Sequence, residues 1–425
     1  MLSTLRNAWR TPELRKRLLF TLFLVAIYRI GSHIPVPGVD TTALQNYATA
    51  GTLMGFYDLI SGGGFSRFNI FTMGVVPYIN ASIVMQLLTI AIPYLEQLSK
   101  EGEEGRKKIQ NYTRYAAVGF ALLQSFTTYI LIVNSGSIKD RSFMTVFVIM
   151  VTVSTASIFL MWLGDQITVR GIGNGVSLLI FVNILSRIPL TITQVAGLQS
   201  AQEVNFVEVI IFIALIAALL LAVIVMSLGE RRIPVQYAGK TVGNKTFRGQ
   251  TTHIPINLNA SGVIAIIFAS SVMAFPETIV QFWPNSVIFK AITGSVYSPF
   301  KRNTWLYALL FFILILFFAW FYTQITFKPD EMAENMHKSS GFIPGIRPGN
   351  STARHIEKVL TKVALFGGVF AGVIAVFPIL LEGYTRFKGV YFGGTSLLIV
   401  VGVALDSLRQ LESQLVMRHY QGFLK

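Results

Sequence analysis

The chain alternates between long runs of apolar residues without charges and short blocks in which its charged residues gather. Asp, Glu, Lys and Arg make up 13% of its 425 residues, about half of the roughly 25% that is usual in a soluble domain. A helix needs about 20 predominantly apolar residues to cross the hydrocarbon core of a bilayer. The pattern therefore predicts a membrane protein whose backbone groups bond within helices, because lipid offers them no partners.

Ten of these runs are long enough to be predicted as membrane-spanning helices, and the fifth is interrupted near its end by Arg187 and Pro189. The ten predicted spans are residues 18–34, 70–95, 115–133, 142–164, 171–193, 209–229, 257–275, 303–327, 363–381 and 389–405. The first run follows a basic segment but has no small-residue cleavage site, so a retained helix is expected rather than a signal peptide. The predicted fold class is an all-α integral membrane protein of about ten helices.

The distribution of Lys and Arg predicts how these helices are oriented. With ten spans and both termini on one side, 25 of the 35 Lys and Arg residues fall on that side. Cytoplasmic connections are enriched in these residues, so both termini are expected in the cytoplasm. Five spans are then followed by five of opposite sense, the arrangement of an inverted repeat. The predicted parts are a cytoplasmic segment at 1–17, halves at 18–200 and 201–408, and a cytoplasmic tail at 409–425.

Two predicted cytoplasmic connections are unusually long, at about 230–256 and 328–362. The second contains two Pro-Gly steps, which fix tight turns and would hold Arg347 at an exposed tip between them. The basic character of both connections has two open explanations. They are either solvated loops on the basic side of the membrane, or docking surfaces for an acidic or RNA-bearing partner.

The connection between the first two spans contains an apolar segment, FYDLISGGGFSRFNIF at 56–71, that is too short to cross a membrane. It includes two charged residues, Asp58 and Arg67, and the three consecutive glycines Gly62, Gly63 and Gly64. Consecutive glycines break a helix and leave the backbone free to move. Irregular backbone persists at membrane depth only where protein buries it or where it lines an aqueous cavity. The segment is therefore either a re-entrant plug or an ordinary external loop.

Signals for catalysis and for ion coupling are weak. Cysteine is absent, which excludes disulfides, thiolate metal sites and cysteine nucleophiles, and the five histidines are scattered in sequence. A coupled carrier places ionisable residues inside its bundle, whereas the ionisable residues in or beside the predicted spans lie near span ends. These are Arg29, Asp165, Arg187, Glu277 and Asp406. We expect a passive path with no enzyme activity, cofactor, metal or small-molecule substrate, and a small-solute carrier remains the alternative.

Seven strings, in order along nearly the whole chain, resemble the SecY family of bacterial protein translocases. The strings are Arg29-Ile30-Gly31 with Ile34-Pro35-Val36-Pro37-Gly38, Ser61-Gly62-Gly63 with Pro77-Tyr78-Ile79, Lys100-Glu101-Gly102-Glu103-Glu104-Gly105-Arg106, Gly171-Ile172-Gly173-Asn174-Gly175, Arg231-Arg232-Ile233-Pro234-Val235-Gln236-Tyr237-Ala238, Gly341-Phe342-Ile343-Pro344-Gly345-Ile346-Arg347-Pro348-Gly349, and Gly393-Gly394-Thr395-Ser396-Leu397-Leu398-Ile399. One such string is weak evidence, but seven in the right order are highly specific.

The resemblance implies an hourglass channel of two five-helix halves, with an aliphatic constriction, a plug and a lateral gate. The implied pore residues are Val75, Ile79, Val176, Ile180, Ile267 and Ile399. The implied plug residues are Tyr57, Asp58, Leu59, Ile60, Ser61, Gly62, Gly63, Gly64, Phe65, Ser66 and Arg67. Gln86 and Asn174 are hypothesised to hold the closed lateral gate by hydrogen bonding.

The same resemblance implies the partners of the chain. Its two long cytoplasmic connections would dock the SecA motor ATPase or the ribosome through Arg231, Arg232, Lys245, Arg248 and Arg347. SecE and SecG are the implied membrane partners, signal peptides and preproteins are the implied substrates, and anionic lipids would surround the basic face. The implied location is the bacterial plasma membrane.

Overall fold

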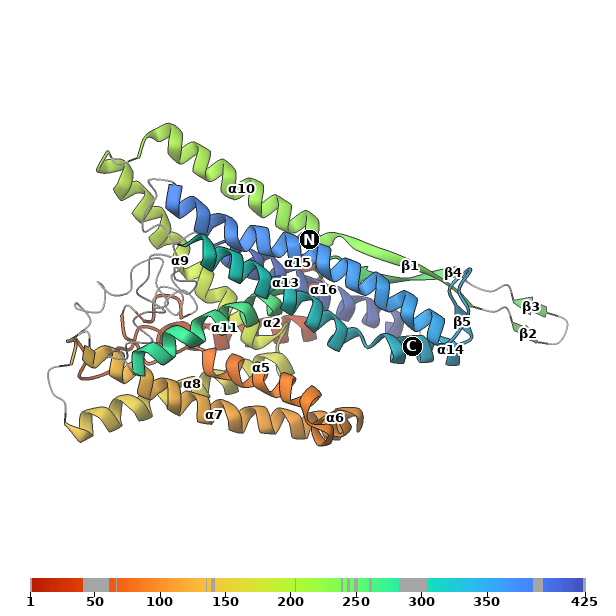
Figure 1. The fold of residues 1–425 in the computed structure, drawn as a ribbon, viewed down its shortest axis with the longest axis horizontal. Helices are drawn as coiled ribbons and strands as arrows, with labels where there is room; N and C mark the ends of the chain where they lie inside the picture. The colour runs from red at the N-terminus through yellow and green to blue at the C-terminus, as the bar shows by residue number, and fades with distance from the viewer. Residues whose placement is uncertain are drawn as a thin grey trace.

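The computed structural model describes residues 2–40, 61–65, 67–134, 136–138, 142–202, 204–237, 240–242, 245–247, 251–259, 262–282, 304–384 and 393–422. Long helices run roughly along one direction, and a small sheet extends from one end of the bundle together with α14 (Figure 1). The fold is therefore an all-α membrane bundle with a β-structured extension.

The first group of helices comes from the N-terminal part of the chain, and its members pack on one another in the pairs α2–α8, α5–α7, α7–α8 and α8–α9. Its elements are α1 (Leu2–Arg10), α2 (Pro12–Gly31), α5 (Val76–Ala91), α6 (Pro93–Lys100), α7 (Glu103–Asn134), α8 (Phe143–Arg170) and α9 (Gly175–Ser200). Glycine permits a close crossing of α8 and α9 in this group. A Cβ atom on Gly175 of α9 would lie 2.0 Å from the carbonyl oxygen of Gly164 on α8.

The second group of helices comes from the C-terminal part, where α13 packs on α11 and α15, and α16 packs on α10 and α15. Its elements are α10 (Phe206–Leu228), α11 (Gly262–Phe282), α13 (Trp305–Phe327), α14 (Pro329–Lys338), α15 (Asn350–Tyr384) and α16 (Gly394–Gly422). The two groups contact each other mainly through α9 with α16, α1 with α16, and α7 with α11.

The two long connections that were predicted to be cytoplasmic form β-structure, which their sequence did not predict. Strands β1 (Glu230–Tyr237), β4 (Thr251–Asn257) and β5 (Gly341–Phe342) form an antiparallel sheet in the order β4-β1-β5, and β2 (Lys240–Val242) pairs with β3 (Lys245–Phe247). Side chains alternate between exposed and buried from Arg232 to Val235, as expected for a strand with one covered face. The covered face packs on α14 and the start of α15 through Ile233, Val235, Ile256, Met336, Ile343, Ile356 and Leu360.

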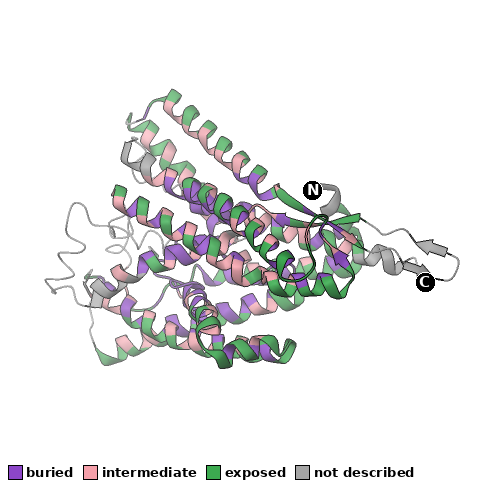
Figure 2. Ribbon diagram, turned by 45° about the vertical axis from the view of Figure 1, so that its right-hand side comes forward, coloured by how far each residue is buried: buried purple, intermediate pink, exposed green. Residues whose placement is uncertain are grey.

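Buried residues concentrate where helices face one another, whereas the outer faces of the bundle remain exposed (Figure 2). Helix α10 is a clear case, since Ile211, Leu221 and Val225 are 59%, 61% and 70% exposed. In a lipid environment such surfaces are covered by acyl chains or by partner helices. Over the described residues, seven helices are long and apolar enough to cross a membrane, or eight if the bent pair α5–α6 is one span. The count of ten spans stays a prediction.

The predicted second span, 70–95, is wrong at both ends. Residues 70–75 form turns, and α5 begins only at Val76. The helix ends at Ala91, where the chain bends by 98° into α6. Pro93 causes this break, because it has no N–H to donate and it restricts the preceding residue to extended backbone; the ψ angle of Ile92 is 114°. In contrast, α9 continues as a helix through Pro189.

Candidate pore, plug and gate

The six residues predicted to line a pore belong to one hydrophobic cluster, although they come from four separate parts of the chain. Val75 and Ile79 lie at the start of α5, and Ile180 lies on α9, where all three are buried. Ile399 on α16 is also buried, and Ile267 on α11 packs against the cluster from a partly buried position. Helices of both groups thus contribute aliphatic side chains to this cluster.

Val176, the remaining predicted pore residue, lies in the first turn of α9 and packs against the same cluster. It is partly buried, and its Cγ2 atom would lie 3.0 Å from a Cβ atom on Gly164 of α8. The side chain therefore packs into the close crossing of α8 and α9.

The described part of the predicted plug is folded into the bundle as irregular, buried backbone. Ser61 is 1% exposed and Phe65 is 4% exposed, whereas Arg67 is exposed. The Ser61 hydroxyl accepts a hydrogen bond from the Phe65 backbone N–H at 3.2 Å, and the Asn69 N–H donates to the carbonyl of Gly64 at 3.0 Å. This burial is what irregular backbone at membrane depth requires. The predicted plug residues Tyr57, Asp58, Leu59, Ile60 and Ser66 lie outside the described residues.

The residues that follow the predicted plug are bonded to the C-terminal end of α2 and to the middle of α8. Val36 donates its backbone N–H to the carbonyl of Phe68 at 2.9 Å, and the Asn69 side chain donates to the carbonyl of Ser32. The Ser157 hydroxyl on α8 donates to the carbonyl of Gly74 at 2.9 Å. Sequence reasoning missed Asn69 and Ser157, although buried polar residues beside apolar runs are a signal that could have identified them.

The glycine-rich string at 171–175 is a junction between four helices. The N–H of Ile172 donates to Thr21 of α2 at 3.2 Å, and that of Gly173 donates to Gln410 of α16 at 2.6 Å. The N–H of Gly175 donates to Thr168 of α8 at 2.9 Å. These glycines allow the backbones of α2, α8, α9 and α16 to approach closely. The structure thus gives a packing role to a string that superficially resembles a nucleotide-binding loop.

Neither residue predicted to hold the lateral gate bonds across the boundary between the two groups of helices. Asn174 caps its own helix, since its side chain accepts from the Ser177 N–H at 3.2 Å, a common role for asparagine before a first helical turn. Gln86 on α5 is partly buried, and in the described part of the chain its side chain makes no hydrogen bond. The hydrogen-bonding hypothesis therefore gains no support at either residue.

The predicted docking residues gather on the β-structured extension. Arg231 and Arg232 are exposed on β1, where Arg232 pairs with Glu230 at 2.9 Å. Arg347 is exposed in the turn between β5 and α15, and the φ angles of Gly345 and Gly349 are +79° and +97°. Lys245 belongs to β3, but its side chain and all of Arg248 lie outside the described residues.

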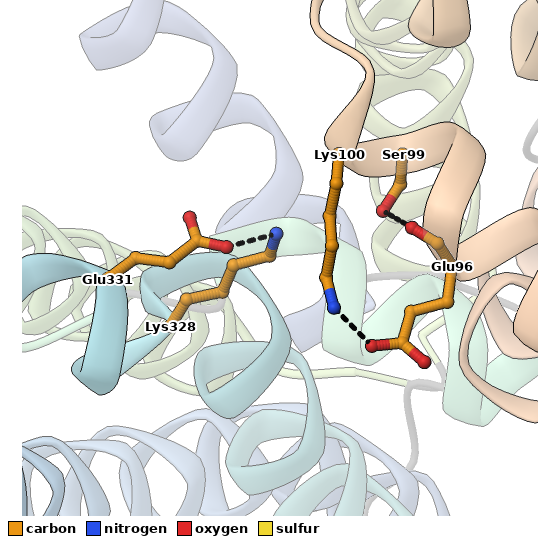
Figure 3. A network of polar contacts seen from close by, with 5 residues as sticks. All are labelled: Glu96, Ser99, Lys100, Lys328 and Glu331. Atoms are coloured by element: carbon orange, nitrogen blue, oxygen red, sulfur yellow. Dashed lines mark hydrogen bonds and ion pairs between the residues drawn. The ribbon is translucent and has the colours of Figure 1, made fainter.

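Four charged residues face one another where α6 approaches the junction of α13 and α14, just beyond the ends of the predicted spans 70–95 and 303–327 (Figure 3). Lys100 bonds to Glu96 at 2.7 Å within α6, and Lys328 bonds to Glu331 at 2.9 Å at the start of α14. The hydrogen bond and charge of Lys100 lower the pKa of Glu96, and the charge of Lys328 adds a smaller lowering. The charge of Lys328 therefore favours the carboxylate of Glu96 across the boundary between the groups of helices.

Together, the long apolar helices with exposed outer faces and the irregular segment buried among them define a polytopic membrane protein. The SecY family model matches residues 69–408. The SecY protein translocase subunit of Aquifex aeolicus is 38% identical over 99% of both chains, and that of Mycobacterium bovis is 41% identical over 100% of both. The chain belongs to the SecY family.

Solved structures agree with this fold. A protein-conducting channel superposes with a TM-score of 0.66 and 19% sequence identity, over 93% of this chain and 91% of that chain. Sec61 in the canine ribosome–channel complex superposes with a TM-score of 0.62 and 17% identity over the same shares.

Proposed function

We propose that this chain is the pore subunit of a bacterial protein translocon. It would pass unfolded, signal-bearing polypeptides across the plasma membrane and release apolar segments sideways into lipid. The path is passive and has no catalytic centre or cofactor, so SecA or the ribosome supplies the driving force. The observation that carries the proposal is that the predicted pore residues belong to, or pack against, one hydrophobic cluster with members in both groups of helices. Branched apolar side chains seal against ions by dewetting and offer no polar group that would hold a passing polypeptide.

The proposed partners follow from the surfaces of the molecule. SecE and SecG would cover exposed apolar helix faces, and preproteins would enter from the cytoplasmic side. Exposed Arg347, Arg231 and Arg232 would contact carboxylates of SecA or phosphates of ribosomal RNA, because a guanidinium binds either group with two parallel hydrogen bonds. Both termini would lie in the cytoplasm, where anionic lipids attract the basic connections. The two halves at 18–200 and 201–408 would move relative to each other.

A cysteine crosslink tests this proposal, because the chain contains no native cysteine. Ile79→Cys places a thiol in the hydrophobic cluster that contains the predicted pore residues. A secretory precursor with a single cysteine is then stalled partway through export. We expect a disulfide between the two that depends on the signal segment of the precursor. Leu123→Cys on α7 is the matched control, since Leu123 is 61% exposed on the outer face. A crosslink at Leu123 but none at Ile79, Ile180 or Ile399 would contradict the channel and favour a small-solute carrier.

A further inference from the structure

A hydrogen bond between two fully buried side chains lies next to the described part of the plug segment. Tyr28 on α2 is 0% exposed and Asn183 on α9 is 1% exposed. The Tyr28 hydroxyl donates to the Asn183 Oδ1 atom at 2.5 Å. Polar groups buried away from water are costly to leave without a partner, so Tyr28 fixes the Asn183 amide in place between the two helices.

The backbone of Gly62 packs directly against the Asn183 amide. A Cβ atom added to Gly62 would lie 2.9 Å from Asn183 Oδ1 and 3.2 Å from the Asn183 Cα atom. The φ angle of Gly62 is +67°, a conformation that residues with a Cβ atom rarely adopt. The backbone therefore closes on α9 at a distance and in a conformation that favour glycine.

Arg187 extends the same surface of α9 by one turn. Its Nη2 atom lies 4.0 Å from the position that a Cβ atom on Gly63 would occupy. Residues four positions apart share one face of a helix, so Asn183 and Arg187 together present this face to two consecutive glycines. The plug segment thus meets α9 at Gly62 and Gly63.

The base of the segment, residues 69–74, is bonded to helices other than α9. Asn69 bonds to the carbonyl of Ser32 at the end of α2, and Ser157 on α8 bonds to the carbonyl of Gly74. Neither bond involves α9. Release of the glycines from α9 would therefore leave the base beyond Asn69 in place.

We propose that Asn183, held by Tyr28, is a positioning residue that forms the seat on which Gly62 closes. The stability of this seat sets how often the plug leaves its closed position in the resting channel. The inference rests on the proposed function, because it requires residues 57–67 to act as a plug. The segment pivots between the seat and its fastened base, and the three glycines supply the backbone freedom for that movement.

The accessibility of the plug in the resting channel tests this inference. A single cysteine is introduced by Phe65→Cys, at a position that is 4% exposed, and the complex in lipid vesicles is labelled with a membrane-impermeant maleimide. Tyr28→Phe removes only the hydroxyl group. Loss of one buried hydrogen bond shifts a two-state equilibrium by about three- to ten-fold, so the labelling rate should rise by that factor.

Two further variants locate the effect. Asn183→Leu removes the amide at similar volume and should also raise the labelling rate. Because both substitutions break the same bond, the double variant should label no faster than Asn183→Leu alone. Tyr307→Phe makes the same chemical change on α13 and should label at the parent rate. Rates for Tyr28→Phe and Asn183→Leu that both stay within about two-fold of the parent rate would overturn the seat, since a buried bond contributes more than this.

A stalled precursor separates failure of this inference from failure of the proposed function. In the parent with Phe65→Cys, stalling should raise the labelling rate. If it does not, residues 57–67 do not act as a plug, and the proposed role of Asn183 is wrong as well. If stalling raises the labelling rate but Tyr28→Phe does not raise it in the resting channel, only the proposed role of Asn183 is wrong.

The rate of export supplies a second readout. Tyr28→Phe should raise the export rate of a precursor with a weakened signal segment by about three- to ten-fold, and should leave the export rate of the intact precursor unchanged. Equal slowing of both precursors would indicate a merely structural role and overturn the seat.

Discussion

The boundary between the two groups of helices has two edges that are built differently. At the bonded edge, formed by α9, α1 and α16, the backbone of Gly173 bonds to Gln410 at 2.6 Å. A buried cluster of Ala8, Leu14, Ile172 and Leu411 reinforces this edge where α1 packs on α16. Directional bonds and close backbone contact fix one relative position of the helices here.

The apolar edge lies where α7 contacts α11, with α5 beside it. Side-chain hydrogen bonds of the described residues of α5 and α7 stay within these helices or reach α8, as Thr89, Thr127 and Ser125 illustrate. Leu87 and Ile90 on α5 are 38% and 47% exposed. An apolar segment of another chain can replace such contacts without leaving a buried polar group unpaired. The bonded edge therefore suits a hinge, and the apolar edge suits a lateral gate.

A substitution at Gly173 in the bonded edge should lower the stability of the protein more than the other changes below. In Gly173→Val, a Cβ atom would lie 2.9 Å from the Ser407 hydroxyl, at a φ angle of +81°. Left-handed backbone and overpacking together should lower the free energy of unfolding by about 3–4 kcal/mol. Thermal unfolding of the purified complex measures this loss. Gly119→Val on α7 is the control, because a Cβ atom there meets nothing within 4 Å. Equal losses at both glycines would contradict the difference between the edges.

A smaller effect is expected from truncating a leucine at each edge. Leu411 is 4% exposed in the cluster of the bonded edge, so Leu411→Ala should cost about 2–3 kcal/mol through lost burial and a residual cavity. Leu87→Ala on α5 removes the same atoms from a half-exposed position and should cost less than about 1 kcal/mol. Thermal unfolding of both variants gives the comparison. A larger loss at Leu87 would mean that the apolar edge is the tighter of the two.

The smallest effect concerns the charges beside the apolar edge. Exposed ion pairs contribute little to stability, so the double variant Glu96→Gln with Lys328→Gln should leave thermal unfolding unchanged. It should instead remove a salt dependence of the distance between α6 and α14, since attraction between exposed charges is screened above about 0.1 M salt. Spin labels at Gln97 and Asn335, both exposed, report this distance. If the distance between the two labels in the parent protein does not lengthen as salt is added, the proposed attraction between Glu96 and Lys328 is wrong.

The protonation of Glu96 sets the pH range of that attraction. Because the pKa of Glu96 is lowered in the folded protein, its carboxylate stays charged through neutral pH. The attraction is present above the usual pKa of a glutamate and is lost as the pH falls through the lowered value. The salt dependence of the label distance should therefore persist at neutral pH and vanish in acid.

The features that could be predicted from the amino-acid sequence depend on residues close together in the chain. Apolar runs predicted the membrane-spanning helices because lipid requires each helix to satisfy its own backbone. The Pro-Gly steps predicted the exposed position of Arg347, which the structure confirms. The glycines predicted that irregular backbone would follow residue 61, and seven ordered strings indicated the family.

Only the tertiary structure decided which distant residues meet. The β-strands escaped prediction because their pairing joins Glu230 to Asn257 and β1 to β5, and such pairing depends on non-local contacts. That Asn174 caps its own helix was likewise visible only in the structure, and its role at a gate stays a prediction. Tyr28 and Asn183 are separated by 155 positions, and the value of their bond arises from burial, which no local pattern encodes.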